Sequence, residues 1–225
     1  MNKLRFFDKK PDCLVCLSGD FPDFSFFDEF SDIPIIAADG AANELLQYSI
    51  IPSFIVGDLD SFIPHFLPAG AACEIIQEES QEINDFEKSM LFALKKGYKH
   101  IVITGLHGGD LEHSLNNVSV LWKLFPLFTT IVLVDSSLRI AIPVDRSFSY
   151  SAHYIGEIVS LIPSPHALLT TSGLQWNLEN EALEFSVREG ARNRVEHLHP
   201  EILIHEGRLL FFCDSRFPLI PIINE

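Results

Sequence analysis

Positively charged side chains are scarce in this chain of 225 residues. It has 16 lysines and arginines against 31 aspartates and glutamates, which gives a formal net charge of −15. A surface that binds nucleic-acid phosphates needs clustered Lys and Arg, so we expect no nucleic-acid partner. A phosphate ligand remains compatible with this composition if a metal ion supplies the positive charge.

Long hydrophobic runs are also missing. No stretch approaches the ~20 apolar residues of a membrane-spanning helix. Residues 1–10 carry charges but no long apolar run follows them, so they do not resemble a signal peptide. We therefore expect a cytoplasmic protein that has no membrane partner.

Cysteine is rare, with four in the chain. Cys13 and Cys16 form a CxxC pattern, but they lie inside an apolar run, and no second pair of ligands stands at a zinc-site spacing. Buried, reduced cysteines in a strand are the favoured interpretation, and a redox or metal role is the alternative.

Two phosphate-binding motifs are absent. The chain has no GxxxxGK[ST], which excludes a P-loop enzyme. It has no GxGxxG either, because Gly105, Gly108 and Gly109 have a different spacing. Any phosphate chemistry must therefore use another arrangement.

What the chain does have is apolar material, at 47% hydrophobic residues with 19 Phe, enough for a substantial core. Apolar strands alternate with helix-forming stretches up to residue 142. Strands are expected at residues 13–17, 33–38, 54–56, 74–76, 101–104 and 131–135, and helices at 41–48, 86–96 and 111–125. This alternation predicts an open, mostly parallel α/β domain over residues 1–142.

The pattern changes after residue 142. Short apolar runs at 157–162, 167–171, 201–204 and 209–212 are separated by prolines and turn residues. A hairpin is expected around Glu206 and Gly207. Residues 143–225 therefore read as a small all-β domain.

Two carboxylates, Asp58 and Asp60, follow the expected strand 54–56 and the glycine at position 57. An unpaired buried carboxylate costs several kcal/mol of desolvation, so a compensating cation is expected. Mg²⁺ is the natural candidate, because it is held by one or two carboxylates together with phosphate oxygens. The alternative is a solvated turn in which one of the two acids caps the next element.

Two further acids, Asp39 and Asp85, also follow predicted strands or precede a predicted helix. The carboxyl ends of parallel strands meet at one edge of a sheet, so Asp39, Asp58, Asp60 and Asp85 should converge there. Such a site suits phosphoryl or pyrophosphoryl transfer, in which catalysis is mainly positioning and charge neutralisation. For Asp85, a purely structural helix cap is the alternative.

An ordered set of short motifs resembles the thiamine pyrophosphokinase family. The set covers about residues 33–195, and its members are Ala38-Asp39-Gly40-Ala41-Ala42-Asn43, Gly57-Asp58-Leu59-Asp60-Ser61, Asn84-Asp85-Phe86-Glu87-Lys88, the glycines 105, 108 and 109 with Glu112-His113, and Gly173-Leu174-Gln175-Trp176-Asn177-Leu178. The resemblance implies an ATP-dependent transfer of a pyrophosphoryl group to the hydroxyl of thiamine, with release of AMP. It also implies an α/β nucleotide domain, a β-sandwich-like C-terminal domain that binds thiamine, and a homodimer with the site at the subunit boundary.

By position, the resemblance also implies residue roles, with ATP as co-substrate. Catalysis and Mg²⁺ binding fall to Asp58, Asp60 and Asp85. The nucleotide and its phosphates fall to Asp39, Ser61, Lys88, Gly108, Gly109, Glu112 and His113. Thiamine falls to Gln81, Asn117, Trp176 and Asn193, with ordinary β-domain core as the alternative for Trp176.

The chain departs from the family's usual pattern at two places. GGRxDH is replaced by a segment with Asp110 and Glu112, and Gly190-Ala191-Arg192 stands where Ser-Thr-Ser usually precedes the asparagine. A related diphosphokinase for another small alcohol, or a decayed nucleotide- or thiamine-binding protein, is therefore the alternative. A phosphatase with an aspartyl nucleophile is disfavoured, because its acids follow the first strand, whereas this pair follows the third.

Overall fold

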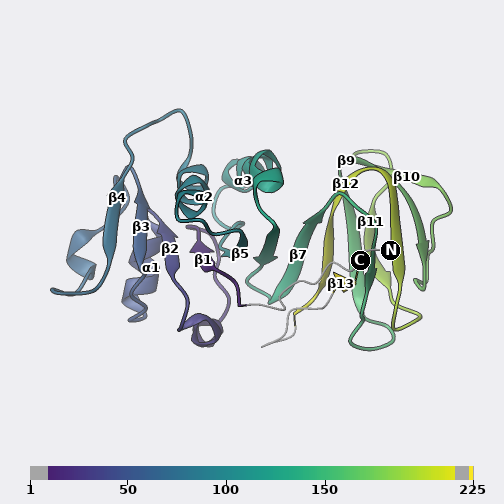
Figure 1. Ribbon diagram of the computed structural model, residues 1–225, viewed down its shortest axis with the longest axis horizontal. Helices are drawn as coiled ribbons and strands as arrows, with labels where there is room; N and C mark the ends of the chain where they lie inside the picture. The colour runs from purple at the N-terminus through teal and green to yellow at the C-terminus, as the bar shows by residue number, and fades with distance from the viewer. Residues whose placement is uncertain (1–9, 216–222, 225) are drawn as a thin grey trace. The chain divides into compact units, whose positions relative to one another are not determined.

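The computed structural model of the chain describes residues 10–215 and the backbone of residues 223–224. It contains two compact units (Figure 1). The first, here called the α/β unit, is Pro11–Ser137, and the second, the β unit, begins at Leu138. Residues 1–9, where the sequence predicts no signal peptide, lie outside the described residues. No helix in the described ranges is long and apolar enough to cross a membrane.

A parallel sheet forms the centre of the α/β unit, as predicted. Its strands are β1 (Cys13–Cys16), β2 (Ile35–Ala38), β3 (Phe54–Gly57), β4 (Glu74–Gln77), β5 (His100–Thr104) and β6 (Thr130–Val134). They pair in the order β4-β3-β2-β1-β5-β6, and every pair is parallel. The order reverses beside β1, which pairs with both β2 and β5. In open α/β sheets, this switch point at the carboxyl ends of the strands is where ligands bind.

Helices join these strands, mostly where the sequence predicts them. They are α1 (Ala41–Gln47), α2 (Asp85–Lys95) and α3 (Leu111–Leu124), with 3-10 helices at Phe24–Phe30, Pro64–Phe66 and Phe125–Leu127. Helix α2 begins at Asn84, whose side chain accepts a hydrogen bond from the Glu87 N–H at 3.0 Å, and it buries Phe86, Met90 and Ala93 against the sheet. A side-chain cap followed by an apolar stripe at helical spacing is what fixes this helix.

Strand β1 also decides the interpretation of the CxxC pattern. Cys13 and Cys16 are both fully buried in it, and burial raises the pKa of both thiols far above the ordinary value. A thiol held protonated is a poor nucleophile and metal ligand. The prediction of buried, reduced cysteines is confirmed.

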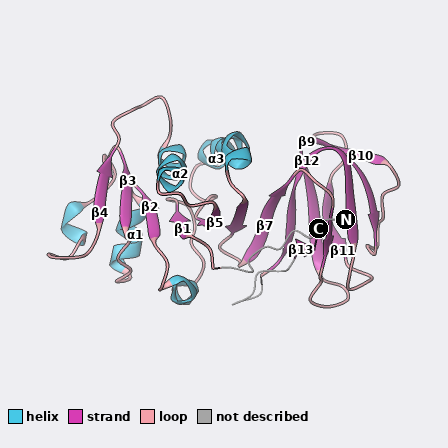
Figure 2. Cartoon of the chain, in the orientation of Figure 1, coloured by secondary structure: helices cyan, strands magenta, loops and turns pink. Residues whose placement is uncertain are grey.

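The β unit is built from antiparallel strands (Figure 2). They are β7 (Arg139–Val144), β8 (Phe148–Tyr150), β9 (Ile158–Ser172), β10 (Glu181–Glu184), β11 (Gly190–Arg194), β12 (Glu201–Asp214) and β13 (Ile223–Asn224). Strand β12 pairs with β7, β8 and β9, while β9 also pairs with β10 and β11, and β13 pairs with β8. Phe148, Tyr150 and Phe211 are fully buried in its core, which gives the predicted all-β architecture. The predicted domain boundary at 142/143 falls inside β7 and stays a prediction.

The predicted hairpin at Glu206 and Gly207 is wrong. Both residues lie within β12, which stays paired with β9 on either side of them, with register shifts between Ile204 and Glu206 and between Gly207 and Leu209. Gly207 has a φ of +81°, and a Cβ there would lie 2.1 Å from the His166 carbonyl oxygen. The glycine therefore serves a bulge with a close backbone approach, and the apolar runs predicted as separate strands merge into the long β9 and β12.

Candidate active site

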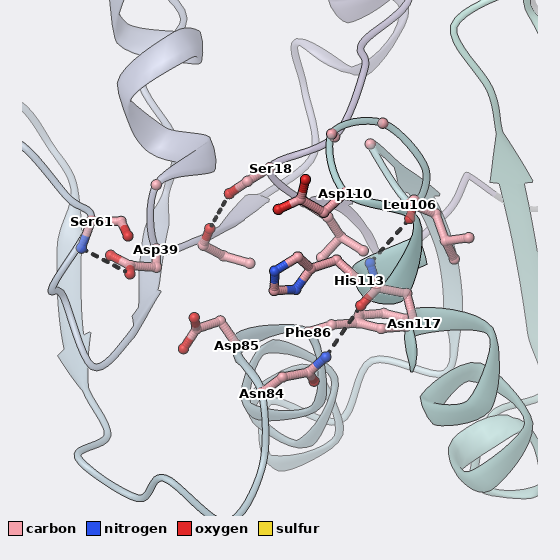
Figure 3. Close-up of a pocket in the computed structure, with 17 residues that line it drawn as sticks. Ser18, Asp39, Ser61, Asn84, Asp85, Phe86, Leu106, Asp110, His113 and Asn117 are labelled. Carbon is pink, nitrogen blue, oxygen red and sulfur yellow. Dashed lines mark hydrogen bonds between the residues drawn. The ribbon is translucent and has the colours of Figure 1, made fainter. Parts of the chain in front are cut away.

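A cavity of about 370 Å³ opens at the switch point of the parallel sheet (Figure 3). Its walls come from the segments that follow β1, β2, β3 and β5 and from the N-terminal parts of α2 and α3. The lining residues are Leu17, Ser18, Gly19, Ala38, Asp39, Gly40, Ser61, Asn84, Asp85, Phe86, Gly105, Leu106, Gly108, Gly109, Asp110, His113 and Asn117. Its position matches the ligand crevice expected for this topology.

Glycines shape this cavity by letting two loops touch. The loop after β1 bonds to the loop after β5, with Gly19 N–H donating to the Gly105 carbonyl at 3.0 Å and Asp20 N–H donating to the His107 carbonyl at 2.8 Å. A Cβ on Gly19 would lie 2.1 Å from the His107 oxygen, and one on Gly108 would lie 2.5 Å from the Asp20 nitrogen. Side chains at these positions would push the loops apart.

Three carboxylates gather beside the cavity. One ligand atom from each of Asp39, Asp58 and Asp60 lies within 4.8 Å of the others. Asp39 is 3% exposed and lines the cavity, and its Oδ2 accepts a hydrogen bond from the Ser61 N–H at 3.2 Å. Its Oδ1 is buried without a hydrogen-bond partner in the described structure. Burial, aided by the nearby charges of Asp85 and Asp60, raises the pKa of Asp39 to about 6.

This arrangement fits a hard divalent cation. A buried carboxylate oxygen that has no donor is costly, and two further carboxylates within reach add repulsion. Oxygen donors at such spacing are the ligands that Mg²⁺ takes in proteins. The predicted metal residues Asp58 and Asp60 are therefore together, with Asp39 beside them. Asp85, predicted as the third ligand, lies outside this group of three but lines the cavity.

Lys88 connects the acids of two elements. Its side chain is 2% exposed, and its Nζ lies 2.9 Å from Asp85 Oδ1 and 3.5 Å from Asp58 Oδ2. Burial lowers the pKa of Lys88, but the two carboxylates more than offset this and raise it overall. Lys88 does not line the cavity. It therefore holds the turn after β3 against the start of α2.

Gln81 contacts the same oxygen of Asp58 as Lys88 does. Its Nε2 donates to Asp58 Oδ2 at 2.7 Å, and this hydrogen bond, with smaller effects from the Asp60 N–H and Lys88, lowers the pKa of Asp58. Asp58 is thereby kept ionised, the state that a metal ligand requires.

A chain of amides links the two helix starts to the glycine loop. Asn84 Nδ2 donates to Asn117 Oδ1 at 3.2 Å, and Asn117 Nδ2 donates to the Leu106 carbonyl at 3.0 Å. In Figure 3 the His113 ring lies between the side of the cavity that holds Asp39 and Asp85 and the side that holds Asp110 and Leu106. Glu112, predicted at this site, is exposed on α3 and does not line the cavity.

The other two predicted residues lie in the β unit. Trp176 and Asn193 both line a smaller pocket of about 180 Å³. Asn193 is buried, accepts a hydrogen bond from the Trp176 N–H at 3.2 Å and donates to its carbonyl at 2.8 Å. The Trp176 side chain, by contrast, is 57% exposed. The alternative that Trp176 is ordinary core is therefore wrong.

Some lining residues carried no assignment from the sequence. Ser18 and Gly19 end the first predicted strand, and Gly40 follows Asp39. The available signal was their position, because each stands at the carboxyl end of a strand in a parallel sheet, where ligands are expected. In the sequence, small residues at these positions indicate turns and do not indicate a binding role.

Comparison with known proteins gives a consistent result for both units. The family model of the thiamin pyrophosphokinase catalytic domain matches residues 31–133, and that of the thiamin pyrophosphokinase vitamin B1 binding domain matches residues 140–207. The chain is 26% identical over 173 residues to Thiamin pyrophosphokinase 1 of Caenorhabditis elegans, covering 71% of this chain and 70% of that protein. It is 33% identical over 149 residues to Thiamine pyrophosphokinase 3 of Oryza sativa subsp. japonica, covering 60% of this chain and 55% of the relative.

Solved structures agree at the level of the fold. The crystal structure of thiamine pyrophosphokinase from Bacillus subtilis superposes with a TM-score of 0.76 at 22% identity, covering 90% of this chain and 98% of that one. The yeast thiamin pyrophosphokinase structure gives a TM-score of 0.74 at 17% identity, covering 93% and 88%. With both domain models matched in order along one chain, this protein belongs to the thiamin pyrophosphokinase family.

Proposed function

We propose that this protein is a thiamine diphosphokinase, which transfers the pyrophosphoryl group of ATP to the hydroxyl of thiamine and releases AMP. The observation that carries the proposal is the buried, unpartnered Asp39 Oδ1 beside Asp58 and Asp60, at the cavity where a parallel sheet binds ligands. A site that concentrates negative charge in this way suits a reaction on a phosphate chain only if a cation accompanies the substrate.

Asp58 and Asp60, with Asp39 and Asp85 on adjoining elements, are the residues that would hold Mg²⁺. Bound there, Mg²⁺ would neutralise the phosphates and stabilise the charge that develops on the transferred group. Lys88 acts through Asp58 and Asp85, because its buried ammonium contacts both carboxylates and not the cavity. We therefore propose that Lys88 positions Asp58 and Asp85 and does not itself contact the phosphates.

The nucleotide phosphates lie along Ser61, Gly108, Gly109 and His113 in this proposal. Gly108 and Gly109 line the cavity, and both have positive φ values, +123° and +63°, a backbone conformation that glycine adopts readily. His113 is the cavity residue whose side chain can become cationic. Glu112, exposed and outside the cavity, has no contact that supports the role expected of it.

The acceptor is the second half of the proposal. Trp176 lines the β-unit pocket, and Asn193 bonds to both the backbone N–H and the carbonyl of Trp176. Gln81 and Asn117 have hydrogen-bond partners in the α/β unit, so their contact with thiamine requires exchange of these partners. We also propose a homodimer with the site at the subunit boundary, and a cytoplasmic location.

The direct test is AMP release from ATP, measured with Mg²⁺ present and thiamine present or absent. We expect AMP and thiamine diphosphate to form together, in equal amounts, only when thiamine is present. AMP release that does not depend on thiamine, with turnover of another small alcohol, would favour a related diphosphokinase. Binding of ATP or thiamine by calorimetry without AMP release would indicate a decayed enzyme.

A further inference from the structure

One serine links the carboxylates of the α/β unit. Ser61 donates its backbone N–H to Asp39 Oδ2 at 3.2 Å (Figure 3) and its hydroxyl to Asp60 Oδ1 at 2.9 Å. Asp39 follows β2, whereas Asp58, Asp60 and Ser61 lie in the turn after β3. The position of the Ser61 backbone therefore decides how closely Asp60 approaches Asp39.

The side-chain amide of Asn43, on helix α1, holds that backbone. Its Nδ2 donates to the Ser61 carbonyl at 2.8 Å, and its Oδ1 accepts from the Ile63 N–H at 2.8 Å. Asn43 is half-buried and does not line the cavity. Within the described residues, its side chain makes no hydrogen bond to a carboxylate. Both ends of the amide are thus used on the backbone of the turn.

Asn43 and Asp39 belong to one short, bonded turn. The Ala42 N–H donates to the Asp39 carbonyl at 3.1 Å. The Asn43 N–H donates to the Gly40 carbonyl at 3.0 Å. Ser61 is therefore held from this turn at both of its backbone groups, the N–H by Asp39 and the carbonyl by Asn43.

The turn that carries the acids needs this support. Leu59 lies between Asp58 and Asp60 and has a φ of +70°, a conformation that is costly for a residue with a side chain. The negative charges of Asp58 and Asp60 also repel that of Asp39. Both effects loosen the turn, and the hydrogen bonds of Asn43 oppose them.

We propose that Asn43 is a positioning residue of the cation site. It fixes the Ser61 backbone and thereby the separation of Asp60 from Asp39, so that their oxygens can bind one cation together with Asp58. This inference rests on the proposed function, because it takes the carboxylate cluster as the site of Mg²⁺. Loss of a residue that orients metal ligands commonly weakens metal affinity about 10- to 100-fold.

The test measures the Kd for Mn²⁺ alone, by calorimetry, in wild type and Asn43→Ala. Alanine favours the helix, so α1 should stay folded, which circular dichroism checks. We expect the Kd for Mn²⁺ to rise about tenfold. The Mg²⁺ concentration for half-maximal AMP release should rise by a similar factor, while the KM for thiamine at saturating Mg²⁺ stays unchanged. An unchanged Kd for Mn²⁺ overturns the proposal.

Two control variants separate positioning from a general structural role. Asp12 Oδ2 accepts from the N–H groups of Lys99 and His100 at 2.7 and 2.9 Å, where β5 begins, at the opposite edge of the sheet. Asp12→Ala therefore also removes two side-chain hydrogen bonds, but it should leave the Kd for Mn²⁺ unchanged. Gln47→Ala, an exposed position one turn further along α1, should do the same. A loss in either control equal to that in Asn43→Ala overturns the proposal.

The outcomes also separate this inference from the proposed function. A protein that releases AMP with thiamine, but whose Mn²⁺ affinity is the same in wild type and Asn43→Ala, overturns the role of Asn43 alone. A wild type whose Mn²⁺ affinity depends on Asn43, yet which releases no AMP with thiamine, overturns the proposed function and supports the role of Asn43.

Discussion

The two units prepare for ligands in opposite ways. In the α/β unit the acidic site ranges from the buried Asp39 through the half-buried Asp58 to the exposed Asp60, and Asp39 and Lys88 are nearly inaccessible. In the β unit the pocket is lined by exposed residues, Trp176, Arg188 and Glu189, together with buried leucines and the buried Asn193, which bonds to the Trp176 backbone. The site in the α/β unit therefore concentrates charge at a cost to stability. The pocket in the β unit has exposed side chains for recognition, and their loss would leave the core intact.

This contrast follows from the two kinds of sheet. A parallel sheet with helices on its faces brings the ends of several strands to one edge, so residues distant in sequence converge there. In the antiparallel unit, β9 and β12 pair along most of their length, and the exposed Trp176 lies in the connection between β9 and β10. Substitutions should therefore affect both stability and catalysis in the α/β unit, but only recognition in the β unit.

The largest expected effect is that of Asp58→Asn. It removes one charge from the carboxylate cluster and a ligand that Gln81 and Lys88 both orient. We expect kcat for AMP release to fall about 100-fold or more, while the circular dichroism spectrum and melting temperature change little. Turnover near the wild-type value would contradict the assignment of the cation site to this cluster.

A steric test comes next in size. Gly19→Ala places a methyl group 2.1 Å from the His107 carbonyl oxygen and 2.3 Å from that of Gly105, both of which are backbone atoms. We expect the free energy of unfolding, measured with urea, to fall by about 2–3 kcal/mol, and nucleotide binding to weaken as the two loops separate. Gly70→Ala is the reference, because nothing lies within 4 Å of its added Cβ and only its φ of +82° makes the substitution unfavourable, by about 1 kcal/mol. An equal loss in both variants would show that the loop contact is unimportant.

Much of the α/β unit could be predicted from the sequence, and for a physical reason. Buried strands and the turn residues after them leave local patterns, so the order of strands and helices, and the approach of Asp39 to Asp58 and Asp60, follow from pattern and topology. The contacts of Lys88 and Gln81 with Asp58 were not predictable, because the sequence spacing does not show that residues 81 and 88 reach residue 58. Which partner a long polar side chain chooses depends on distances of a few ångströms.

Less of the structure of the β unit could be predicted from the sequence. Its all-β character follows from the short apolar runs, but the bulges that make β9 and β12 long continuous strands have no such signal. A glycine between two apolar runs suits a hairpin as well as a bulge. The close contact of Gly207 with the His166 carbonyl, which decides between them, is a long-range property.

The third prediction concerns pH. Asp39 has a pKa of about 6 in the fold against 3.8 for an ordinary aspartate, so the folded state binds its proton more tightly than the unfolded state. Its favourable contribution is complete below about pH 4 and is lost as pH rises to about 6 and beyond. In metal-free protein, Asp39→Asn should therefore be more stable than the wild type at pH 7, by on the order of 2 kcal/mol, and no more stable at pH 4.

Urea titrations at several pH values, with and without Mg²⁺, measure this difference. Added Mg²⁺ should stabilise the wild type more than Asp39→Asn, since a cation that binds only the folded state raises its stability. A stability difference that does not vary between pH 4 and pH 7 would mean that the burial of Asp39 costs nothing.

The smallest effect is expected in the β unit, from Trp176→Ala. The indole is 57% exposed, so its loss removes little buried area and should leave the melting temperature nearly unchanged. Loss of a cation–aromatic contact should raise the KM for thiamine about fivefold, without changing the KM for ATP or kcat. Phe185→Ala is the matched control, because Phe185 is 66% exposed in the same unit and lies outside the pocket. If Trp176→Ala destabilised the protein as much as Gly19→Ala, the contrast between a charged site and a surface pocket would fail, because the pocket would then be part of the core.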